Sequence, residues 1–128
     1  MVEVSVIIVN YNTKELTIAC IESVKKKTTG VNYDIYVVDN DSKDGSDDIL
    51  PKLFPDIHYI KNEKNIGFGQ ANNIAIEQTN AKYVFLLNSD TLLVNNAIKI
   101  LYDFLEADKN ESIACCGGAL FNMDMTPQ

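Results

Sequence analysis

Alternating apolar runs and helical patterns constrain the fold of this chain more than any other feature of its sequence. The first run, VSVIIVNYN at residues 4–12, is almost continuously β-branched, which is typical of a central parallel strand covered on both faces. We expect further strands in the runs at residues 33–40, 56–62, 82–90 and 112–122. Helices are expected at residues 13–30, from near Ser46 to residue 54, at 67–79 and at 95–108. This alternation predicts one α/β domain over residues 1–128, with a Rossmann-like, mostly parallel sheet and helices on both faces.

The first predicted helix carries signals at both of its ends. Asn12 is placed to cap its start, with Glu15 three residues later in a capping-box arrangement. Lys25 to Lys27 meet the negative end of the helix dipole, and Gly30 is expected to end the helix.

The charge balance limits the partners of the chain. Its formal net charge is -7 at pH 7, and lysine supplies all the positive charge because the sequence contains no arginine. Phosphate backbones attract basic surfaces, so nucleic acid is not an expected partner. A phosphorylated ligand would have to bind through backbone amides, a cation or the few lysines.

Several features favour a cytoplasmic protein. No apolar stretch approaches the roughly 20 residues needed to cross a bilayer, and MVEVSVIIVN lacks the basic leader of a secretion signal. The three cysteines indicate buried free thiols in a reducing compartment rather than a disulfide framework. The only histidine, His58, is expected to face a sheet edge and not to act in catalysis. Whether a longer protein docks on the inner face of a membrane stays open.

Three polar clusters directly follow predicted strands: Asn10–Asn12, Asp39–Asp41 and Asn88–Asp90. Because the carboxyl ends of parallel strands share one edge of a sheet, all three clusters should line the edge where ligands of α/β proteins bind. Each cluster taken alone is equally compatible with ordinary turn chemistry.

The segment NIGFGQANN leads into a predicted helix start, where free backbone amides can face an anion. It differs from the dinucleotide-binding fingerprint, because Asn72 stands where the third glycine or alanine belongs and the motif follows the third strand. A phospho-receiver domain is also disfavoured, because it needs an acidic pair after its first strand, where this chain reads NYN.

Taken together and in this order, VSVIIVNYN, VVDNDSKDGS, NIGFGQANN and FLLNSD resemble the nucleotide-sugar-binding half of family 2 glycosyltransferases of the GT-A fold. LLNSD and GFGQANN look closest to the rhamnosyltransferase-like branch of that family. The resemblance covers almost the whole chain. It implies a transferase that moves a sugar from a UDP- or dTDP-type donor to an acceptor hydroxyl, with metal assistance and inversion. The acceptor would be a glycan or a lipid-linked sugar, and the implied role is cell-wall or polysaccharide biosynthesis.

The resemblance also implies roles for individual residues. Tyr11 matches the aromatic residue that packs on the nucleotide base, and Asp39 matches the carboxylate that hydrogen-bonds the base or ribose. Asp90 matches the last aspartate of the acidic metal motif and would hold Mg²⁺ or Mn²⁺. The implied nucleotide-binding set is Val9, Asn10, Tyr11, Asp39, Asp41, Gly67, Gly69, Asn72, Asn88 and Ser89.

Elementary chemistry agrees with a metal at Asp90. Mg²⁺ and Mn²⁺ prefer oxygen ligands, and they commonly combine one or two carboxylates with substrate phosphates. Two positions depart from the family pattern: Asn88 replaces its first acidic residue, and Asn72 stands where many relatives carry arginine.

The catalytic base that the family carries in its second half is expected beyond residue 128. We therefore expect a donor-binding fragment, which binds a nucleotide sugar but lacks most of the acceptor half and transfers nothing alone. An unpaired edge of the predicted strand at 113–121 would be free to pair with another copy of the chain. The alternative is a non-catalytic α/β domain used for partner binding or assembly.

Overall fold

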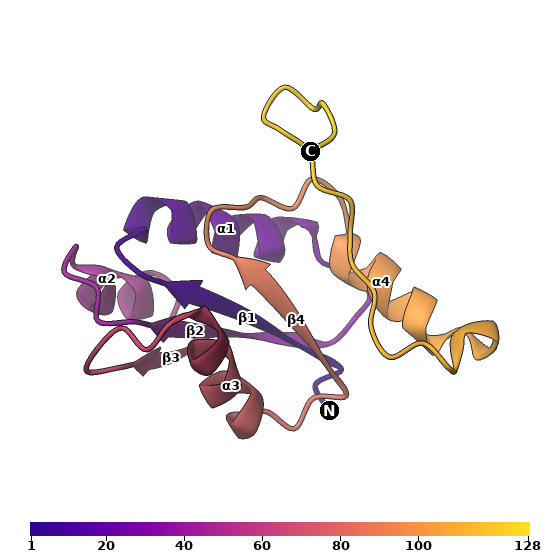
Figure 1. Ribbon diagram of the computed structural model, residues 1–128, viewed down its shortest axis with the longest axis horizontal. Coiled ribbons are helices and arrows are strands. Elements are labelled where there is room, and N and C mark those ends of the chain that lie inside the picture. Colours follow the sequence, from indigo (N-terminus) through magenta and orange to yellow (C-terminus); the bar gives the residue numbers. More distant parts are fainter.

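The computed structural model describes all residues from 1 to 128 and contains the predicted alternation of strands and helices (Figure 1). The strands are β1 (Val4–Asn10), β2 (Tyr33–Asp39), β3 (His58–Lys61) and β4 (Tyr83–Asn88). The helices are α1 (Lys14–Lys27), α2 (Ser46–Leu53), α3 (Phe68–Gln78) and α4 (Ala97–Glu106), followed by the short 3₁₀ helix η1 (Asp108–Asn110).

All four strands are parallel and lie in the order β3-β2-β1-β4. The register places Asn10 beside Asp39, and Val9 beside Asn88, at the carboxyl ends of their strands. The predicted α/β architecture is confirmed, and the first predicted strand is one of the two central strands. His58 begins β3, an outer strand, where its ring stacks on Tyr36 with 4.3 Å between the ring centroids.

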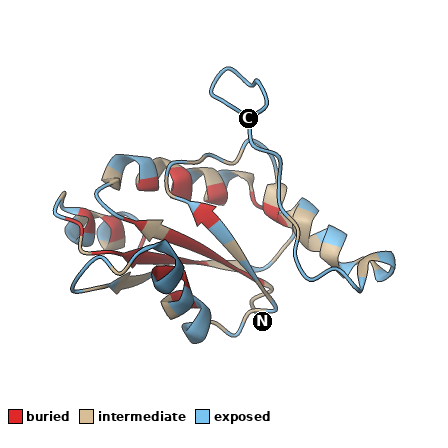
Figure 2. Ribbon diagram, viewed as in Figure 1, coloured by how far each residue is buried: buried red, intermediate tan, exposed pale blue.

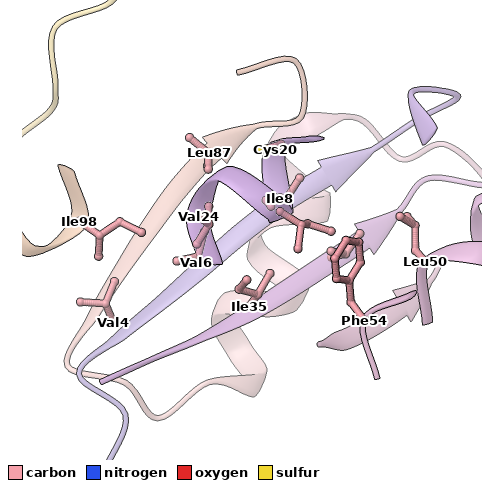
Figure 3. Close-up of a cluster of buried hydrophobic side chains, with 12 residues drawn as sticks. Val4, Val6, Ile8, Cys20, Val24, Ile35, Leu50, Phe54, Leu87 and Ile98 are labelled. Carbon is pink, nitrogen blue, oxygen red and sulfur yellow. The ribbon is translucent and has the colours of Figure 1, made fainter. Parts of the chain in front are cut away.

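Helices cover both faces of the sheet (Figure 2). Successive apolar side chains of β1 and β2 point to opposite faces, and each face packs against helices. On one face, Ile8 and its neighbours pack with residues of α1, α2 and α4 in a cluster of 12 buried residues (Figure 3). On the other face, Ile7 packs with α3 through Ala71 and Ala75. Two-sided burial explains why the first run is almost entirely β-branched.

Helix α1 begins and ends differently from the sequence prediction. The Asn12 side chain does not cap it: Asn12 has a φ of 53° and accepts a 2.7 Å hydrogen bond from the Lys43 backbone. The Asp44 carboxylate instead accepts a 2.9 Å bond from the Lys14 N–H, so the cap comes from another loop. At the other end, the helix stops at Lys27, before Gly30.

The predicted fifth strand at 112–122 is wrong. This segment forms no strand, and its only pairing is one isolated bridge between Phe121 and Pro127. A strand needs a hydrogen-bonded neighbour, and a cavity of about 740 Å³ lies between this segment and β4. On this side of the sheet the edge strand is therefore β4, on which Val84 and Leu86 are exposed.

The cysteines are free thiols, as predicted, but they are not all buried. Cys20 is buried, Cys116 is half-buried and Cys115 is exposed in the segment that lacks a neighbouring strand. Burial raises the pKa of Cys20 to about 11, so this thiol stays protonated at neutral pH. No helix of the chain is both long and apolar enough to span a bilayer.

Candidate functional site

The carboxyl edge of the sheet brings together four loops that are distant in the sequence. The loop after β1 contacts the loop after β2, since the Asn12 N–H donates to Ser42 Oγ over 2.9 Å. The loop after β2 contacts the start of α3, because Asn40 Nδ2 donates to the Gly67 carbonyl over 3.2 Å. The loop after β4 meets the loop after β1 through hydroxyl groups. The expectation that these strand-end clusters share one edge is confirmed.

Asn10 is the centre of a buried polar network at this edge. Its Nδ2 donates to Asp39 Oδ1 over 2.8 Å and to Ser42 Oγ over 3.2 Å. Its Oδ1 accepts bonds from the hydroxyls of Thr13 and Thr17, each over 2.9 Å. Asn10 has no exposed surface. Its role is therefore to hold the surrounding loops in place through these hydrogen bonds.

Asp39 lies in the same network and is also fully buried. Its Oδ2 accepts the Ser42 N–H over 3.0 Å, and its Oδ1 accepts from both Asn10 and the Ser42 hydroxyl. These bonds compensate the cost of burying a carboxylate. In this conformation Asp39 holds the loop after β2 in place and presents neither oxygen to a ligand.

The other carboxylates of the loop after β2 also have partners within the protein. Asp41 has a φ of 66° and forms an ion pair with Lys43, with 2.6 Å between Asp41 Oδ1 and Lys43 Nζ. Burial opposes ionisation of Asp44, but hydrogen bonds from Ser46 and from the Lys14 backbone outweigh it and lower the pKa of this carboxyl group. Lys43, in this loop, and Lys14, at the start of α1, are therefore the cations beside these carboxylates, in a chain that has no arginine.

Two predicted site residues stand free at this edge. The Tyr11 side chain is 49% exposed, and Asp90 is exposed and makes no hydrogen bond or ion pair. The chain nowhere gathers three His, Cys, Asp or Glu side chains that could enclose a metal. Asp90 fits a metal only as a single carboxylate ligand, with the remaining oxygens supplied by a diphosphate and water.

The strand-end residues Val9 and Asn88 lie beside each other at the top of the sheet. Val9 is half-buried against the apolar cluster under α3, whereas Asn88 is exposed. The Asn88 carbonyl accepts bonds from the Thr91 N–H over 3.2 Å and from the Thr91 hydroxyl over 2.7 Å. These bonds close the turn that presents Ser89 and Asp90.

The start of α3 offers backbone donors to an anion. The helix has no side-chain cap at its N-terminus and no acidic residue in its first turn. Its first amides, including that of Gly69, therefore keep free N–H groups and a favourable dipole. Asn72 is only 3% exposed; its Nδ2 donates to the Phe68 carbonyl over 3.1 Å, and its buried Oδ1 has no partner.

The backbone conformation at position 67 requires glycine, so replacing Gly67 should destabilise the fold. Its φ of 85° and ψ of 170° lie in a region open almost only to glycine, although a Cβ added there would meet no atom within 4 Å. We expect Gly67→Ala to lower the free energy of unfolding by about 2 kcal/mol through strain alone. Gly69→Ala is the matched control, since Gly69 is helical and equally open, and it should be neutral or stabilising. Urea denaturation of both variants measures the difference, and equal losses would contradict this account.

Sequence reasoning did not predict which residues join the loops, although it placed Asn40 at this edge. Asn62 Nδ2 donates to Asn40 Oδ1 over 3.0 Å, so two asparagines connect the ends of β3 and β2 to the start of α3. Thr13 and Thr17 hold Asn10 from helix α1. The linking role of Asn40 and Asn62 could have been inferred from their positions, because both directly follow strands.

Comparison with known proteins identifies the family. Residues 5–126 match the family model "Glycosyl transferase family 2", so the chain belongs to this family. It is 27% identical to the glycosyltransferase GlyG of Streptococcus pneumoniae over 124 residues, which cover 94% of this chain and 40% of GlyG. It is 34% identical to the Escherichia coli UDP-Glc:alpha-D-GlcNAc-diphosphoundecaprenol beta-1,3-glucosyltransferase WfaP over 107 residues, which cover 83% of this chain and 42% of WfaP.

Solved structures give the same fold. The S. aureus TarS 1-349 structure in complex with UDP-GlcNAc superposes with a TM-score of 0.71 at 25% identity, covering 81% of this chain and 31% of that one. The mannosyltransferase PcManGT from Pyrobaculum calidifontis, solved with GDP-Man and Mn2+, matches with a TM-score of 0.75 at 19% identity, over 83% of this chain and 33% of that one. The fold is of the GT-A type. The chain spans well under two thirds of the length of each of these relatives.

Proposed function

We propose that this chain is the donor-binding half of a glycosyltransferase that moves a sugar from a nucleoside diphosphate to an acceptor hydroxyl. One observation carries the proposal. The buried network around Asn10 ties the loops of the sheet edge together and leaves Tyr11, Asp90 and the first amides of α3 unengaged around them. These are the groups that an aromatic base and a charged diphosphate need.

The base lies against Tyr11 in this proposal. The ring is half-exposed and belongs to a loop that is fixed on both sides, through Asn10 and Asn12. Stacking of a base on an aromatic side chain contributes roughly 1–3 kcal/mol. Asp39 supports this loop from below, so its contribution to base binding is to position the neighbouring residues.

The diphosphate lies between Asp90 and the start of α3. The free amides of the first turn of α3, near Gly67 and Gly69, hydrogen-bond its oxygens, and Lys43 or Lys14 adds positive charge. Asp90 would hold Mg²⁺ or Mn²⁺, and the ion would supply Lewis-acid stabilisation of the negative charge that develops on the departing nucleotide. The Mn2+ in the PcManGT complex supports this choice of ion.

The sugar end of the donor is assigned to the surroundings of Asn72 and Asn88. Asn72 Oδ1 is a buried acceptor without a donor, and such groups are costly unless a hydroxyl or water reaches them. Asn88 replaces an acidic residue, which leaves Asp90 as the single carboxylate ligand of the ion.

The remaining parts of the activity belong to the longer protein in this proposal. An inverting transfer needs a base for the acceptor hydroxyl, and we assign it to residues beyond 128. Assignment to the rhamnosyltransferase-like branch, a glycan or lipid-linked acceptor, and a cytoplasmic site on the inner membrane face remain proposals. Pairing of two copies would use the exposed edge of β4.

Calorimetric titration with UDP and dTDP, each with and without Mn²⁺, tests the function. Replacement of Tyr11 tests the proposed site of the base most directly. We expect metal-dependent binding of one nucleotide. Tyr11→Ala should weaken it about 10-fold, because it removes the stacking surface. Tyr11→Phe, which keeps the ring, should bind like the parent. If neither nucleotide binds with or without metal, the chain is the non-catalytic domain that we considered as the alternative.

A further inference from the structure

One hydrogen bond joins the metal-binding turn to the nucleotide-binding loop. Thr13 Oγ1 and Ser89 Oγ lie 3.1 Å apart, although 76 residues separate them in the sequence. Ser89 directly precedes Asp90, and Thr13 follows Tyr11 by two residues. Ser89 makes no other side-chain hydrogen bond, and no other hydrogen bond joins residues 88–91 to residues 11–13.

On the Thr13 side, the contact continues into the buried network. Thr13 Oγ1 also donates to Asn10 Oδ1 over 2.9 Å, and Asn10 Nδ2 holds Asp39 and Ser42. Ser42 Oγ in turn accepts the Asn12 N–H over 2.9 Å. Hydrogen bonds therefore connect Ser89 to the residues on both sides of Tyr11, Asn10 and Asn12.

On the Ser89 side, the turn is anchored at its two ends, where Asn88 pairs with Val9 and the Leu93 N–H donates to Ser23 Oγ over 3.0 Å. Between these anchors, the Asp90 side chain has no hydrogen-bond partner. A cation on Asp90 would order this turn, because it fixes the one free carboxylate of the turn. An ordered turn holds Ser89 against Thr13.

We propose that Thr13 and Ser89 are positioning residues that couple metal binding at Asp90 to nucleotide binding at Tyr11. The coupling rests on the proposed function and adds to it a path through the protein, separate from the direct contact between ion and phosphate. It is reciprocal, so a bound base also favours the metal-competent turn. The nucleotide-sugar donor then binds with full affinity only when both its base and the metal ion are bound.

The test compares how much Mn²⁺ strengthens UDP binding in the parent and in three variants. Calorimetry gives the dissociation constant of UDP in excess EDTA and in saturating Mn²⁺, and their ratio is the metal enhancement. We expect Ser89→Ala to reduce the enhancement roughly fivefold, the effect of one neutral hydrogen bond. Thr13→Val should reduce it equally, and the double variant no further. If dTDP is the nucleotide that binds, it replaces UDP throughout.

Two controls separate coupling from a merely structural effect. Thr13→Ser keeps the hydroxyl and should keep the parent's enhancement. Ser112→Ala changes an exposed serine with no hydrogen bond and should behave as the parent.

The outcomes distinguish this inference from the proposed function. Absence of any nucleotide binding by the parent would overturn both. If the parent binds UDP with a metal enhancement that Ser89→Ala leaves unchanged, the coupling is refuted and the proposed function stands. Ser89→Ala that weakens UDP equally with and without Mn²⁺ would show Ser89 to be a direct ligand and would also refute the coupling.

Discussion

Asp90→Asn is expected to remove nearly all of the strengthening that Mn²⁺ gives to nucleotide-diphosphate binding. Loss of a partner that only supports a metal ligand typically costs 10- to 100-fold in metal affinity, so loss of the only carboxylate ligand should cost about 100-fold or more. The neutral amide keeps the size of the side chain and one oxygen, but it lacks the charge that attracts the ion. Affinity measured in EDTA should stay near that of the parent, because the Asp90 side chain is exposed and makes no hydrogen bond or ion pair within the protein.

Asp108→Asn is the matched control for this experiment. Asp108 is exposed and lies in η1, beyond α4, away from the four loops of the site. Its replacement changes the net charge of the chain equally and should leave the Mn²⁺ enhancement unchanged. Equal enhancement in the parent and Asp90→Asn would contradict the assignment of the metal to Asp90.

Asp39→Ala is expected to destabilise the fold by about 3 kcal/mol, because it leaves buried donors without an acceptor. The buried Ser42 N–H would lose its acceptor, and Asn10 Nδ2 would keep only its 3.2 Å bond to Ser42 Oγ. For a chain of this length, the melting temperature should fall by roughly 10 °C. Thermal and urea denaturation measure both quantities.

Asp48→Ala is the control for the stability experiment. Asp48 pairs with Lys52 across one turn of α2, and its side chain is 67% exposed, so the change should cost less than about 0.5 kcal/mol. An Asp39→Ala variant that is as stable as the parent but binds no nucleotide would contradict the structural role. It would favour instead the direct base or ribose contact that the family resemblance implies.

The parts of the fold that the sequence predicted are those determined by local pattern. The run at 4–12 is apolar at consecutive positions, and only a central parallel strand buries both sets of side chains. Polar clusters that directly follow such strands must share one edge, so the position of the site was also predictable. The family resemblance covered the same residues.

The errors arose where distant residues decide the local structure. Helix α1 is capped by Asp44, which lies 30 residues from Lys14, and no local signal at Asn12 reveals this. The segment 112–122 has an apolar strand-like pattern, but no neighbouring strand satisfies its backbone. The burial of Asp39, a feature that the sequence did not address, also depends on distant partners, since Asn10 on β1 and Ser42 in the following loop both bond its carboxylate.

The position of a bound Mn²⁺ ion tests the central claim most directly. In the presence of the nucleotide that binds, paramagnetic broadening of amide signals reports which residues lie near the ion. We predict strong broadening at residues 88–91, at 11–13, which contact Ser89 through Thr13, and at 67–70, and none at 108–110 in η1. Broadening centred on any other group of carboxylates, with sharp signals around Asp90, would contradict the account.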